Sequence, residues 1–596
     1  MEKDPNRNLI AFAVITGITL ILYQVFVTGP YTKHHQQAAQ LLAAQQRAQA
    51  VATAPGAAQA PAFGATPPVS VAAHVPIDTP SLTGSLDLQG ARLDQLALKH
   101  YRLTPDPRSP MVPLLRPAGQ DHAWFMQTGW LPANGAALPE QDPILWTAQP
   151  GARLTPSTPL VLTYANAQGL AISRTIAVDA NALFTVTDAV TNSTGQPLSL
   201  RNYGLVEQQG LPENLAHSGI VHEGAIAVAG DGVLKLATYQ DWKKKGYPDQ
   251  ASVGGWVGST EKYWLTALIP DQSLKLTDTF PTLSVNGQDI YKSGFLGPVE
   301  TVAPGATLTR TTHLFAGAKV VPVLKAYSVQ LKTPKLDWSV DWGHFWFFTQ
   351  PLFSLLETLK GFIGNVGLSI LALTVLVKLV FFPLANKSYE SMSKMKKIQP
   401  QLEALKKQYG DDQAKVQQET MALYQREKIN PFMGCLPMLI QIPVFFSLYK
   451  VLNVTIEMRQ APFFGWIHDL STRDPTTIWN LFGALPFDPS HLAFVGPLLD
   501  TQLHLGAWPI FYGFTMWLSQ AMSPQAGTDP TQKMMFQLMP IFFTFIMTQF
   551  AVGLLIYWTW NNLLTITQQY LIMHRLKVDN PIDSFVARFS RARPAG

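Results

Sequence analysis

The sequence predicts a polytopic α-helical membrane protein with six transmembrane helices and a large antiparallel β-sandwich domain outside the membrane. Apolar residues make up 47% of the 596-residue chain and charged residues only 14%, which is typical of membrane proteins. Apolar runs long enough to cross a bilayer core fill most of the C-terminal half. The region before them alternates short apolar runs with turn residues, as antiparallel sheets do.

Composition also limits the classes of function. The formal net charge is +5, and Cys435 is the only cysteine, so a disulfide-stapled secreted domain is excluded. The chain has no G-x-x-x-x-G-K-[ST] phosphate loop and no G-x-S-x-G nucleophile elbow. His34, His35 and the scattered other histidines make no convincing metal-ligand spacing. We therefore expect no catalytic residues, no metal and no cofactor.

The N-terminal part predicts an anchor and a tether. Residues 1–28 contain an apolar run of about 20 residues preceded by Lys3 and Arg7, and bulky residues stand where a signal-peptide cleavage site would be needed. This pattern indicates an uncleaved signal-anchor helix. Residues 29–76 are rich in Ala, Gln and Pro and have few large apolar side chains, so they predict a linker without a packed core.

Residues 77–325 predict the β-sandwich. Alternating runs such as 183–187 and 307–311 are separated by turn residues including Asn181, Gly195 and Pro197. Three tryptophans, Trp242, Trp256 and Trp264, are compatible with a sugar site, but large rings also fill sandwich cores, and we expect the second role. Residues 326–362 follow as a connector and an amphipathic helix at the membrane surface, with Trp342 and Trp346 four residues apart at the interface.

The membrane core is predicted at residues 363–573, and its central feature is the apolar stretch 364–383. Lys378 lies inside this stretch, with Thr374 and Gly367 near the same helical face. A lysine at the centre of a membrane costs roughly 2.5–3.5 kcal/mol on the translocon scale, and such cations usually face a bundle interior or a wet cavity. Two interpretations remain open: a functional intramembrane cation, or a side chain that reaches the interface along its own aliphatic stem.

Residues 385–430 predict a helical hairpin with an apolar seam and a basic exterior. Its candidate docking residues for partners are Lys394, Lys396, Lys397, Lys406 and Lys407. So many basic residues beside a span place the hairpin in the cytoplasm and the β domain, one span away, outside it. In a Gram-negative cell that outside compartment is the periplasm. Most of these lysines are equally explained as a solvated charged face.

Four further spans are expected at about 432–455, 506–523, 534–549 and 552–572. The loop 456–505 has few basic residues, which suits the outer side, whereas the tail 574–596 is basic and predicts a cytoplasmic C-terminus. Together with the anchor helix, these segments give six spans with both termini in the cytoplasm. The protein is thus expected in a bacterial inner membrane.

The sixth span carries a polar stripe. It consists of Trp558, Asn561, Asn562, Thr565, Gln568 and Gln569. Because amides facing lipid are expensive, this stripe must face protein or water. It could hold helices together through interhelical hydrogen bonds, or it could line a hydrated cavity together with Lys378. We include Gln441, which lies between Pro437 and Pro443 on the third span, in the candidate cavity.

Several long motifs resemble the YidC/Oxa/Alb family of membrane protein insertases. They are GSLDLQGARLDQLALKHY near 84, LFAGAK at 314–319, GNVGLSILALTVLVKLVFFPL at 364–384, YESMSKMKKIQPQLEALKKQYGDD at 389–412, NPFMGCLPMLIQIPVFFSLYKVL at 430–452 and RQAPFFGWIHDLS at 459–471. The resemblance covers nearly the whole chain. It implies a periplasmic β-supersandwich and five core helices that enclose a hydrophilic groove.

The resemblance also implies roles for individual residues. The basic residue of the family's groove falls on Lys378, although arginine is frequent there, and Thr374 and Trp558 fall on substrate-facing positions. Trp558 stands where tyrosine is familiar, and the loop 476–505 looks longer than the family pattern. The implied partners are nascent membrane proteins, the ribosome, the Sec translocon, the signal recognition particle and its receptor, and anionic lipids, with no nucleic acid substrate.

The sequence therefore predicts a non-enzymatic insertase and chaperone that integrates nascent inner-membrane proteins, alone or with the Sec translocon. One alternative is a secondary transporter of a small anion, with Lys378 as the counter-ion. Such a transporter is expected to show internal repeats among its spans, and none is visible in the sequence. Another alternative is a membrane-anchored protein that binds or modifies sugars through its β domain.

Overall fold

The computed structural model describes residues 73–591 except 134–136, 140–143, 168, 214, 216–220, 286, 411, 431–432, 434–435, 486–503 and 524–529. The predicted anchor 1–28, nearly all of the linker 29–76, Cys435 and the last five residues lie outside the described residues. The chain divides into two compact units, Met1–His344 and Phe345–Gly596. They are called the β unit and the helical unit below.

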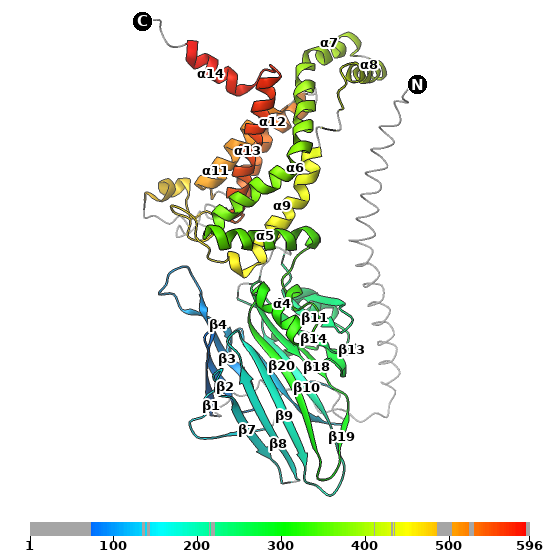
Figure 1. Ribbon diagram of the computed structural model, residues 1–596, viewed down its shortest axis with the longest axis vertical. Helices are drawn as coiled ribbons and strands as arrows, with labels where there is room; N and C mark the ends of the chain where they lie inside the picture. Colours follow the sequence, from blue (N-terminus) through cyan, green and yellow to red (C-terminus); the bar gives the residue numbers. More distant parts are fainter. Residues whose placement is uncertain are drawn as a thin grey trace. The chain divides into compact units, whose positions relative to one another are not determined.

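The β unit contains two antiparallel sheets (Figure 1), which confirms the predicted antiparallel β domain. The first sheet has the order β1-β2-β3-β5-β10-β18-β16-β13, with β4, β17 and β19 paired beside this path. Its strands are β1 (His74–Asp78), β2 (Leu82–Asp87), β3 (Arg92–Arg102), β4 (Met111–Leu115), β5 (Trp124–Pro132), β10 (Leu198–Gln209), β13 (Gln250–Val253), β16 (Lys275–Thr279), β17 (Thr282–Val285), β18 (Gln288–Leu296) and β19 (Glu300–Val302).

The second sheet has the order β12-β11-β14-β15-β20-β9-β8-β7-β6. Its strands are β6 (Thr147–Ala148), β7 (Leu160–Ala165), β8 (Leu170–Val178), β9 (Leu183–Asn192), β11 (Gly224–Ala229), β12 (Leu234–Thr238), β14 (Gly255–Thr260), β15 (Trp264–Ile269) and β20 (Thr307–Ala318). The short helices α3 (Tyr239–Lys245), α4 (Val321–Gln330) and η2 (Leu336–Ser339) complete the unit.

The core of the β unit lies between the sheets, where β10 and β18 pack against β14 and β15. Burial alternates along β9, as expected for a strand with one face on the core. Trp242, Trp256 and Trp264 are 1%, 2% and 9% exposed. The Trp242 indole nitrogen donates to the Phe280 carbonyl at 2.8 Å. The three tryptophans are therefore core residues, as expected, and not an open sugar-binding surface.

A buried ion pair joins the two sheets. Arg174 of β8 and Asp188 of β9 are direct cross-strand partners, and two guanidinium nitrogens donate to the two carboxylate oxygens at 2.7 Å each. The third nitrogen donates to the carbonyl of Thr128 on β5 at 2.9 Å. Trp130, also on β5, donates to Asp188 at 2.9 Å. Arg174 is 1% exposed, so its charge depends on these partners.

A second buried carboxyl, which has no ion pair among the described residues, makes the stability of the β unit pH-dependent. Asp278 of β16 is 3% exposed, and burial raises the pKa of its carboxyl to about 7, against the opposing charge of Lys235. The pKa of an aspartate in an unfolded chain is about 3.9. The folded protein therefore retains the proton to higher pH than the unfolded chain. The resulting contribution to stability is largest below pH ~4 and is lost as the pH rises to about 7.

We expect Asp278→Asn to remove this loss because a neutral amide replaces a buried carboxylate. The free energy of unfolding should rise by on the order of 2–4 kcal/mol at pH 8 and change little at pH 4. Urea unfolding of the full chain, followed by tryptophan fluorescence at both pH values, measures the difference. Asp249→Asn, at an exposed position, is the control. An equal effect of Asp278→Asn at both pH values would contradict the assignment.

The described helices of the helical unit are α5 (Trp346–Ile363), α6 (Val366–Lys397), α7 (Gln399–Tyr409), α8 (Gln413–Arg426), α9 (Leu436–Val454), α11 (Ala507–Met522), α12 (Pro530–Met547), α13 (Val552–Arg575) and α14 (Pro581–Arg591), with the 3-10 turns η4 (Ile456–Met458) and η5 (Ile478–Gly483) (Figure 1).

A sharp break separates the first two helices, α5 and α6. Gly364 ends α5 with φ 77°, and the Asn365 side chain accepts from the Leu368 amide to cap α6. The Phe463 ring packs closely against Gly367 on α6, so that a Cβ at this position would lie only 2.1 Å from the ring.

The expectation that Trp342 joins Trp346 on the interfacial helix is wrong. Trp342 precedes α5 and belongs to the β unit, where it is 3% exposed and its indole nitrogen donates to the Asp337 carbonyl at 3.2 Å. Trp346 is the first residue of α5 and is 45% exposed. The indole of Trp342 therefore finds both apolar cover and a hydrogen-bond acceptor in the protein, which removes its reason to lie at an interface.

Among the described residues, α6 alone is long and apolar enough, by length and composition, to cross a membrane. The segment Gln537–Met547 within α12 is a shorter apolar helix. The helices α9, α11, α12 and α13 lie in the regions where the third to sixth spans are predicted. The helix α6 continues without interruption through Pro383 to Lys397, so the apolar stretch and the start of the hairpin form one 32-residue helix.

The hairpin that follows has the predicted apolar seam. Its buried centre consists of Ile398, Leu423 and Ile429, and Met395, Leu402, Leu405 and Tyr424 pack around it. Asp412 begins α8 by accepting a hydrogen bond from the Lys415 amide at 3.1 Å. The seam joins the end of α6 to α7 and α8 and leaves the charged side chains on the outside.

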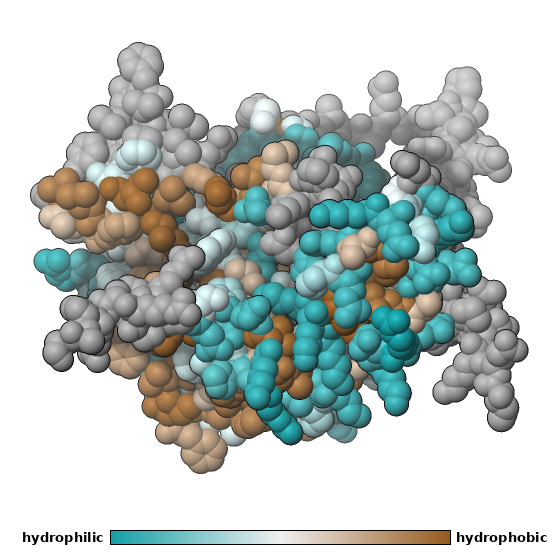
Figure 2. Space-filling model, turned by 90° about the horizontal axis from the view of Figure 1, so that it is seen from above, coloured by the Kyte–Doolittle hydropathy of each residue, from teal (hydrophilic) through white to brown (hydrophobic). Residues whose placement is uncertain are grey.

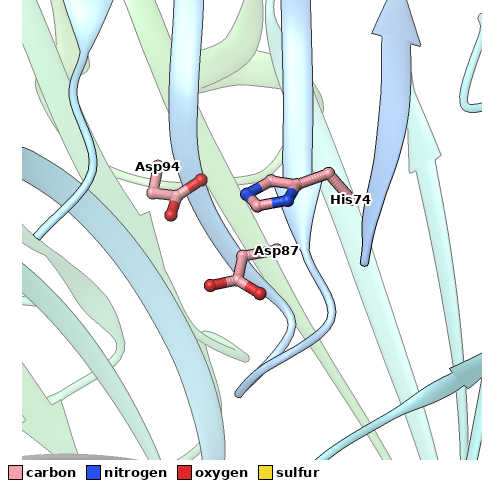
Figure 3. Close-up of side chains that lie close together, drawn as sticks. All are labelled: His74, Asp87 and Asp94. Atoms are coloured by element: carbon pink, nitrogen blue, oxygen red, sulfur yellow. The ribbon is translucent and has the colours of Figure 1, made fainter. Parts of the chain in front are cut away.

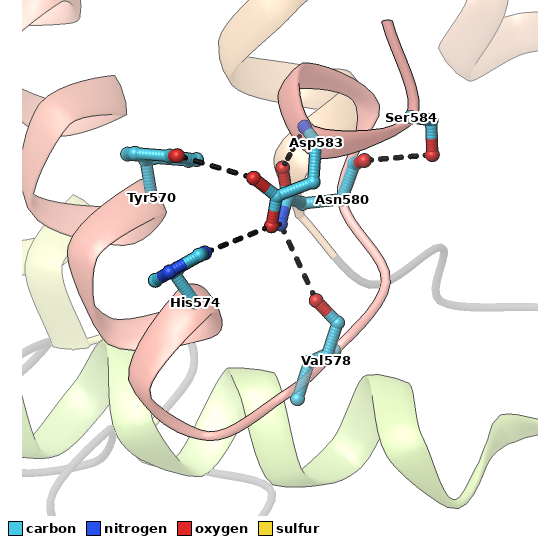
Figure 4. Close-up of polar contacts among 6 residues, drawn as sticks. All are labelled: Tyr570, His574, Val578, Asn580, Asp583 and Ser584. Carbon is cyan, nitrogen blue, oxygen red and sulfur yellow. Dashed lines mark hydrogen bonds and ion pairs between the residues drawn. The ribbon is translucent and has the colours of Figure 1, made fainter. Parts of the chain in front are cut away.

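Toward the C-terminus of the helical unit, a polar network joins α13 to α14 (Figure 4). Asp583 accepts from the Tyr570 hydroxyl at 3.1 Å and from the Asn580 amide at 2.6 Å, and His574 lies 3.1 Å away. The Asn580 side chain accepts in turn from the Asp583 backbone amide at 2.8 Å and so caps α14. The His574 and Asn580 contacts lower the pKa of the Asp583 carboxyl.

Candidate functional site

A cavity in the helical unit collects most of the polar side chains that the sequence singled out. Helix α5 contributes Leu352 to its wall, and α6, α9 and α13 contribute the rest. These other lining residues are Leu373, Thr374, Val377, Lys378, Phe381, Leu384, Ala385, Tyr389, Gln441, Val444, Leu448, Tyr557, Asn561 and Gln568. The cavity volume of about 60 Å³ is room for about four water molecules at ~15 Å³ each.

Lys378 is the only charged side chain among these lining residues. Its ammonium donates to the Thr565 hydroxyl on α13, and that hydroxyl donates to the Asn561 carbonyl at 2.8 Å. The ammonium has three donors, and the described lining offers it no carboxylate. A cation held by a hydroxyl in a small, largely apolar cavity attracts water and anions, because either restores the solvation that the ammonium loses on burial.

Other polar groups surround this cation. The Gln441 amide on α9 donates to the Tyr557 hydroxyl on α13 at 2.6 Å. Thr374 is 3% exposed, and its hydroxyl donates to the Ile370 carbonyl one turn earlier on α6, 2.7 Å away. The Gln568 amide nitrogen is buried and has no hydrogen-bond partner among the described residues. The cavity therefore presents donors that a polar occupant can satisfy.

The polar stripe of α13 divides into two faces. At about 100° per residue, Tyr557, Asn561 and Gln568 fall close together and line the cavity, whereas Trp558 and Asn562 point roughly 100° further round the helix. The Asn562 amide donates to the Thr515 hydroxyl on α11 at 3.2 Å. Thus the structure brings Lys378, Thr374, Gln441 and Asn561 together, with Thr565 bonded to Lys378, and places Asn562 against a neighbouring helix.

Trp558 lies in an aromatic stack and not among the cavity-lining residues. Its ring is 4.6 Å from that of Phe445 with an interplanar angle of 12°, and 5.4 Å from that of Tyr512 with an angle of 25°. Phe550 packs at 6.4 Å. Two of the polar lining residues, Tyr389 and Tyr557, were not predicted from the sequence. Tyr557 stands four residues before Asn561 on one helical face, and that spacing was the available signal.

The hairpin lysines differ in what they contact. Lys394 pairs with Glu390 at 3.1 Å, and the Lys396 ammonium donates to the Ala521 carbonyl at the end of α11, 3.3 Å away. Lys397 and Lys407 are exposed, and Lys406 is half-buried. Figure 2 views the end of the protein that carries α7 and α8 in Figure 1 and shows hydrophilic residues gathered there. The exposed lysines are the ones available to an anionic partner.

Comparison with known proteins decides the family. Residues 74–355 match the family model described as the YidC periplasmic domain, and residues 358–580 match that of the 60Kd inner membrane protein. The membrane protein insertase YidC of Caulobacter vibrioides (strain NA1000 / CB15N) is 50% identical over 627 aligned positions, which cover 100% of both chains. The chain belongs to the YidC family of membrane protein insertases.

Other YidC proteins are similar over almost their whole length. That of Beijerinckia indica is 45% identical, covering 98% of this chain and 99% of the relative, and that of Maricaulis maris is 43% identical, covering 99% of both. The first family model covers the β unit and the start of α5, and the second covers most of the helical unit. The chain is therefore a YidC-family inner-membrane protein, with a periplasmic domain that corresponds to the β unit.

Proposed function

We propose that this chain inserts nascent membrane proteins by receiving their hydrophilic segments in the cavity around Lys378. The observation that carries the proposal is the Lys378 ammonium, which faces a cavity of about 60 Å³ lined by both apolar and polar side chains and is held by the Thr565 hydroxyl. A short acidic tail of a substrate would pair with this cation halfway across the membrane. Its desolvation cost would fall accordingly.

The driving force of the proposed reaction is physical and needs no covalent step. The apolar span of the substrate moves into lipid as its tail passes the cavity, and apolar transfer contributes about 25 cal/mol per Å² of buried surface. The membrane potential contributes about 2.3 kcal/mol per charge per 100 mV. We therefore assign no catalytic residue, metal or cofactor to this activity.

The proposed topology has six spans, with both termini in the cytoplasm and the β unit in the periplasm. The basic residues of the hairpin support this orientation. The aromatic stack of Trp558, Phe445 and Tyr512 supports closure of the cavity on the periplasmic side, because tightly stacked rings exclude water and ions. Hydrophilic substrate segments would then arrive only from the cytoplasm.

The hairpin of α7 and α8 is proposed to dock the machinery that delivers substrates. Exposed Lys397 and Lys407 suit the anionic surfaces of a ribosome or of lipid headgroups. The signal recognition particle with its receptor and the Sec translocon are further proposed partners, on the family resemblance. The hairpin position at the end of α6 would bring a docked ribosome close to the cavity helix.

Neighbouring asparagines on α13 provide a matched test. In a Cys435→Ser background, Asn561→Cys lies on the cavity wall, whereas Asn562→Cys faces Thr515 on α11. A thiol reagent that cannot cross membranes is applied to inverted vesicles and, separately, to spheroplasts. We expect Asn561→Cys to react from the cytoplasmic side at least about 10-fold faster than Asn562→Cys, since only the first position faces a hydrated space.

The same labelling distinguishes the alternatives. Equal reaction of Asn561→Cys from both sides would contradict the one-sided cavity and favour a channel or an alternating-access anion transporter. Absence of reaction from either side would contradict a hydrated cavity and leave the polar groups of α13 with a purely structural role.

A further inference from the structure

Three potential metal ligands meet at one end of the first sheet of the β unit (Figure 3). They are His74 at the start of β1, Asp87 at the end of β2 and Asp94 on β3. One ligand atom from each lies within 4.8 Å of the others. His74 and Asp87 are direct partners across the β1–β2 pair. A β-bulge between Ser85 and Leu86 shifts the β2–β3 register just before this point.

The burial of the three side chains suits a cation with access from one side. Asp87 and Asp94 are 0% and 2% exposed, whereas His74 is exposed and closes the cluster toward solvent. Figure 3 shows the Asp94 carboxyl directed toward the His74 ring. One Asp94 oxygen is fully buried and has no hydrogen-bond partner in the described residues. A buried carboxylate oxygen without a partner is costly, and a bound cation removes that cost.

Contacts within the protein hold both carboxylate oxygens of Asp87 in place. One of its oxygens accepts from the Gln89 backbone amide at 2.9 Å, and the other is 3.4 Å from an Arg92 guanidinium nitrogen. Arg92 also lies over the Phe125 ring at 4.9 Å. The Gln89 amide therefore orients the Asp87 carboxylate in the manner of a second coordination shell.

We propose that His74, Asp87 and Asp94 bind a divalent transition-metal ion, with Zn²⁺ as the preferred ion. One imidazole and two carboxylates form a ligand set that zinc accepts, and water would complete a tetrahedral site. Ligand atoms on one zinc lie roughly 3–4 Å apart, so the cluster closes with a small movement of the exposed His74 side chain.

Bound zinc would cross-link the first three strands of the β unit. The strand β1 is the last strand on the path of its sheet; beyond β2, its other side is held by an isolated bridge between Ile77 and Leu154. Zinc bound through His74 would fix β1 to β2 and β3 where the linker 29–76 joins the sheet. A chain with one cysteine cannot make this cross-link with a disulfide, whereas a metal ion provides it without thiols.

The test uses the full-length protein in lipid nanodiscs, freed of metal with a chelator and titrated with ZnCl₂ in a calorimeter. His34→Ala and His35→Ala are present throughout, so that this N-terminal pair does not contribute. We expect one zinc per chain, and His74→Ala and Asp94→Asn should each weaken its binding by about 10-fold or more. Asp106→Asn, on an exposed Asp106–Arg108 pair, is the matched control and should bind normally.

A second measurement covers the case in which Asp94→Asn fails to fold. Hydrogen exchange of the β1 amides should slow when zinc is added to the background protein and remain unchanged by zinc in His74→Ala. Because His74 is exposed, its replacement leaves the core intact. Absence of stoichiometric zinc binding, or the same zinc affinity in His74→Ala as in the background, would overturn the proposal.

Discussion

Replacing Lys378 with alanine is expected to reduce insertion of substrates with acidic periplasmic tails by on the order of tenfold or more, while Lys378→Arg retains insertion. Two unit charges 4 Å apart attract by about 4 kcal/mol at an effective dielectric constant of 20, and each 1.4 kcal/mol changes a rate about tenfold. Arginine keeps the positive charge although its planar guanidinium differs in shape from an ammonium. We therefore expect insertion to depend on the charge more than on this difference in shape. The measurement is protease protection of a radiolabelled two-span substrate in inverted vesicles.

Two controls separate the cavity charge from general effects. Lys387→Ala removes an exposed lysine from the same helix, outside the cavity lining, and should insert the substrate normally. A substrate whose tail has been neutralised should depend much less on Lys378. If wild type, Lys378→Ala and Lys378→Arg inserted the acidic-tailed substrate equally well, the proposed role of the cation would be refuted.

The second large effect is expected in the β unit. Asp188→Ala should lower the free energy of unfolding of this unit by about 3–5 kcal/mol, because it leaves the buried Arg174 guanidinium without its carboxylate. Trp130 loses its hydrogen-bond acceptor at the same time. Urea unfolding followed by near-ultraviolet circular dichroism of the buried tryptophans measures the loss.

A surface ion pair provides the comparison for Asp188. Asp106→Ala breaks the exposed pair with Arg108 and should cost less than about 1 kcal/mol. The double variant Arg174→Met, Asp188→Leu should recover much of the stability, since it removes both buried charges together. A loss in Asp188→Ala no larger than that in Asp106→Ala would show that the two sheets do not depend on this pair.

Sequence patterns predicted the elements of this protein better than their contacts. The alternation in residues 183–187 predicted a strand, and β9 is buried on alternate residues because one of its faces packs toward the first sheet. The apolar stretch around Lys378 predicted α6 in the same way. These signals are local, since they follow from the period of a strand or a helix and from the cost of exposing apolar side chains.

The polar stripe of α13 is a feature whose contacts local sequence patterns did not predict. Helical spacing placed Asn561 and Asn562 on one broad polar face, but which of two adjacent amides meets the cavity depends on how α6, α9 and α11 pack around the helix. Trp342 is a similar case, because the Asp337 carbonyl that holds it is brought there by the chain around η2. The cluster of His74, Asp87 and Asp94 depends on strand pairing and a bulge, which no sequence spacing reveals.

The uninterrupted helix α6 connects the hairpin directly to the cavity around Lys378. From Lys378 to Lys397 the helix rises 1.5 Å per residue, so the two lysines are about 28 Å apart along the helix axis. Pro383 lies inside this stretch of α6 and lacks the amide hydrogen that would bond back to Leu379, which makes it a point where the helix bends easily. A force on the hairpin would therefore bend α6 at Pro383, which is little more than one helical turn from Lys378.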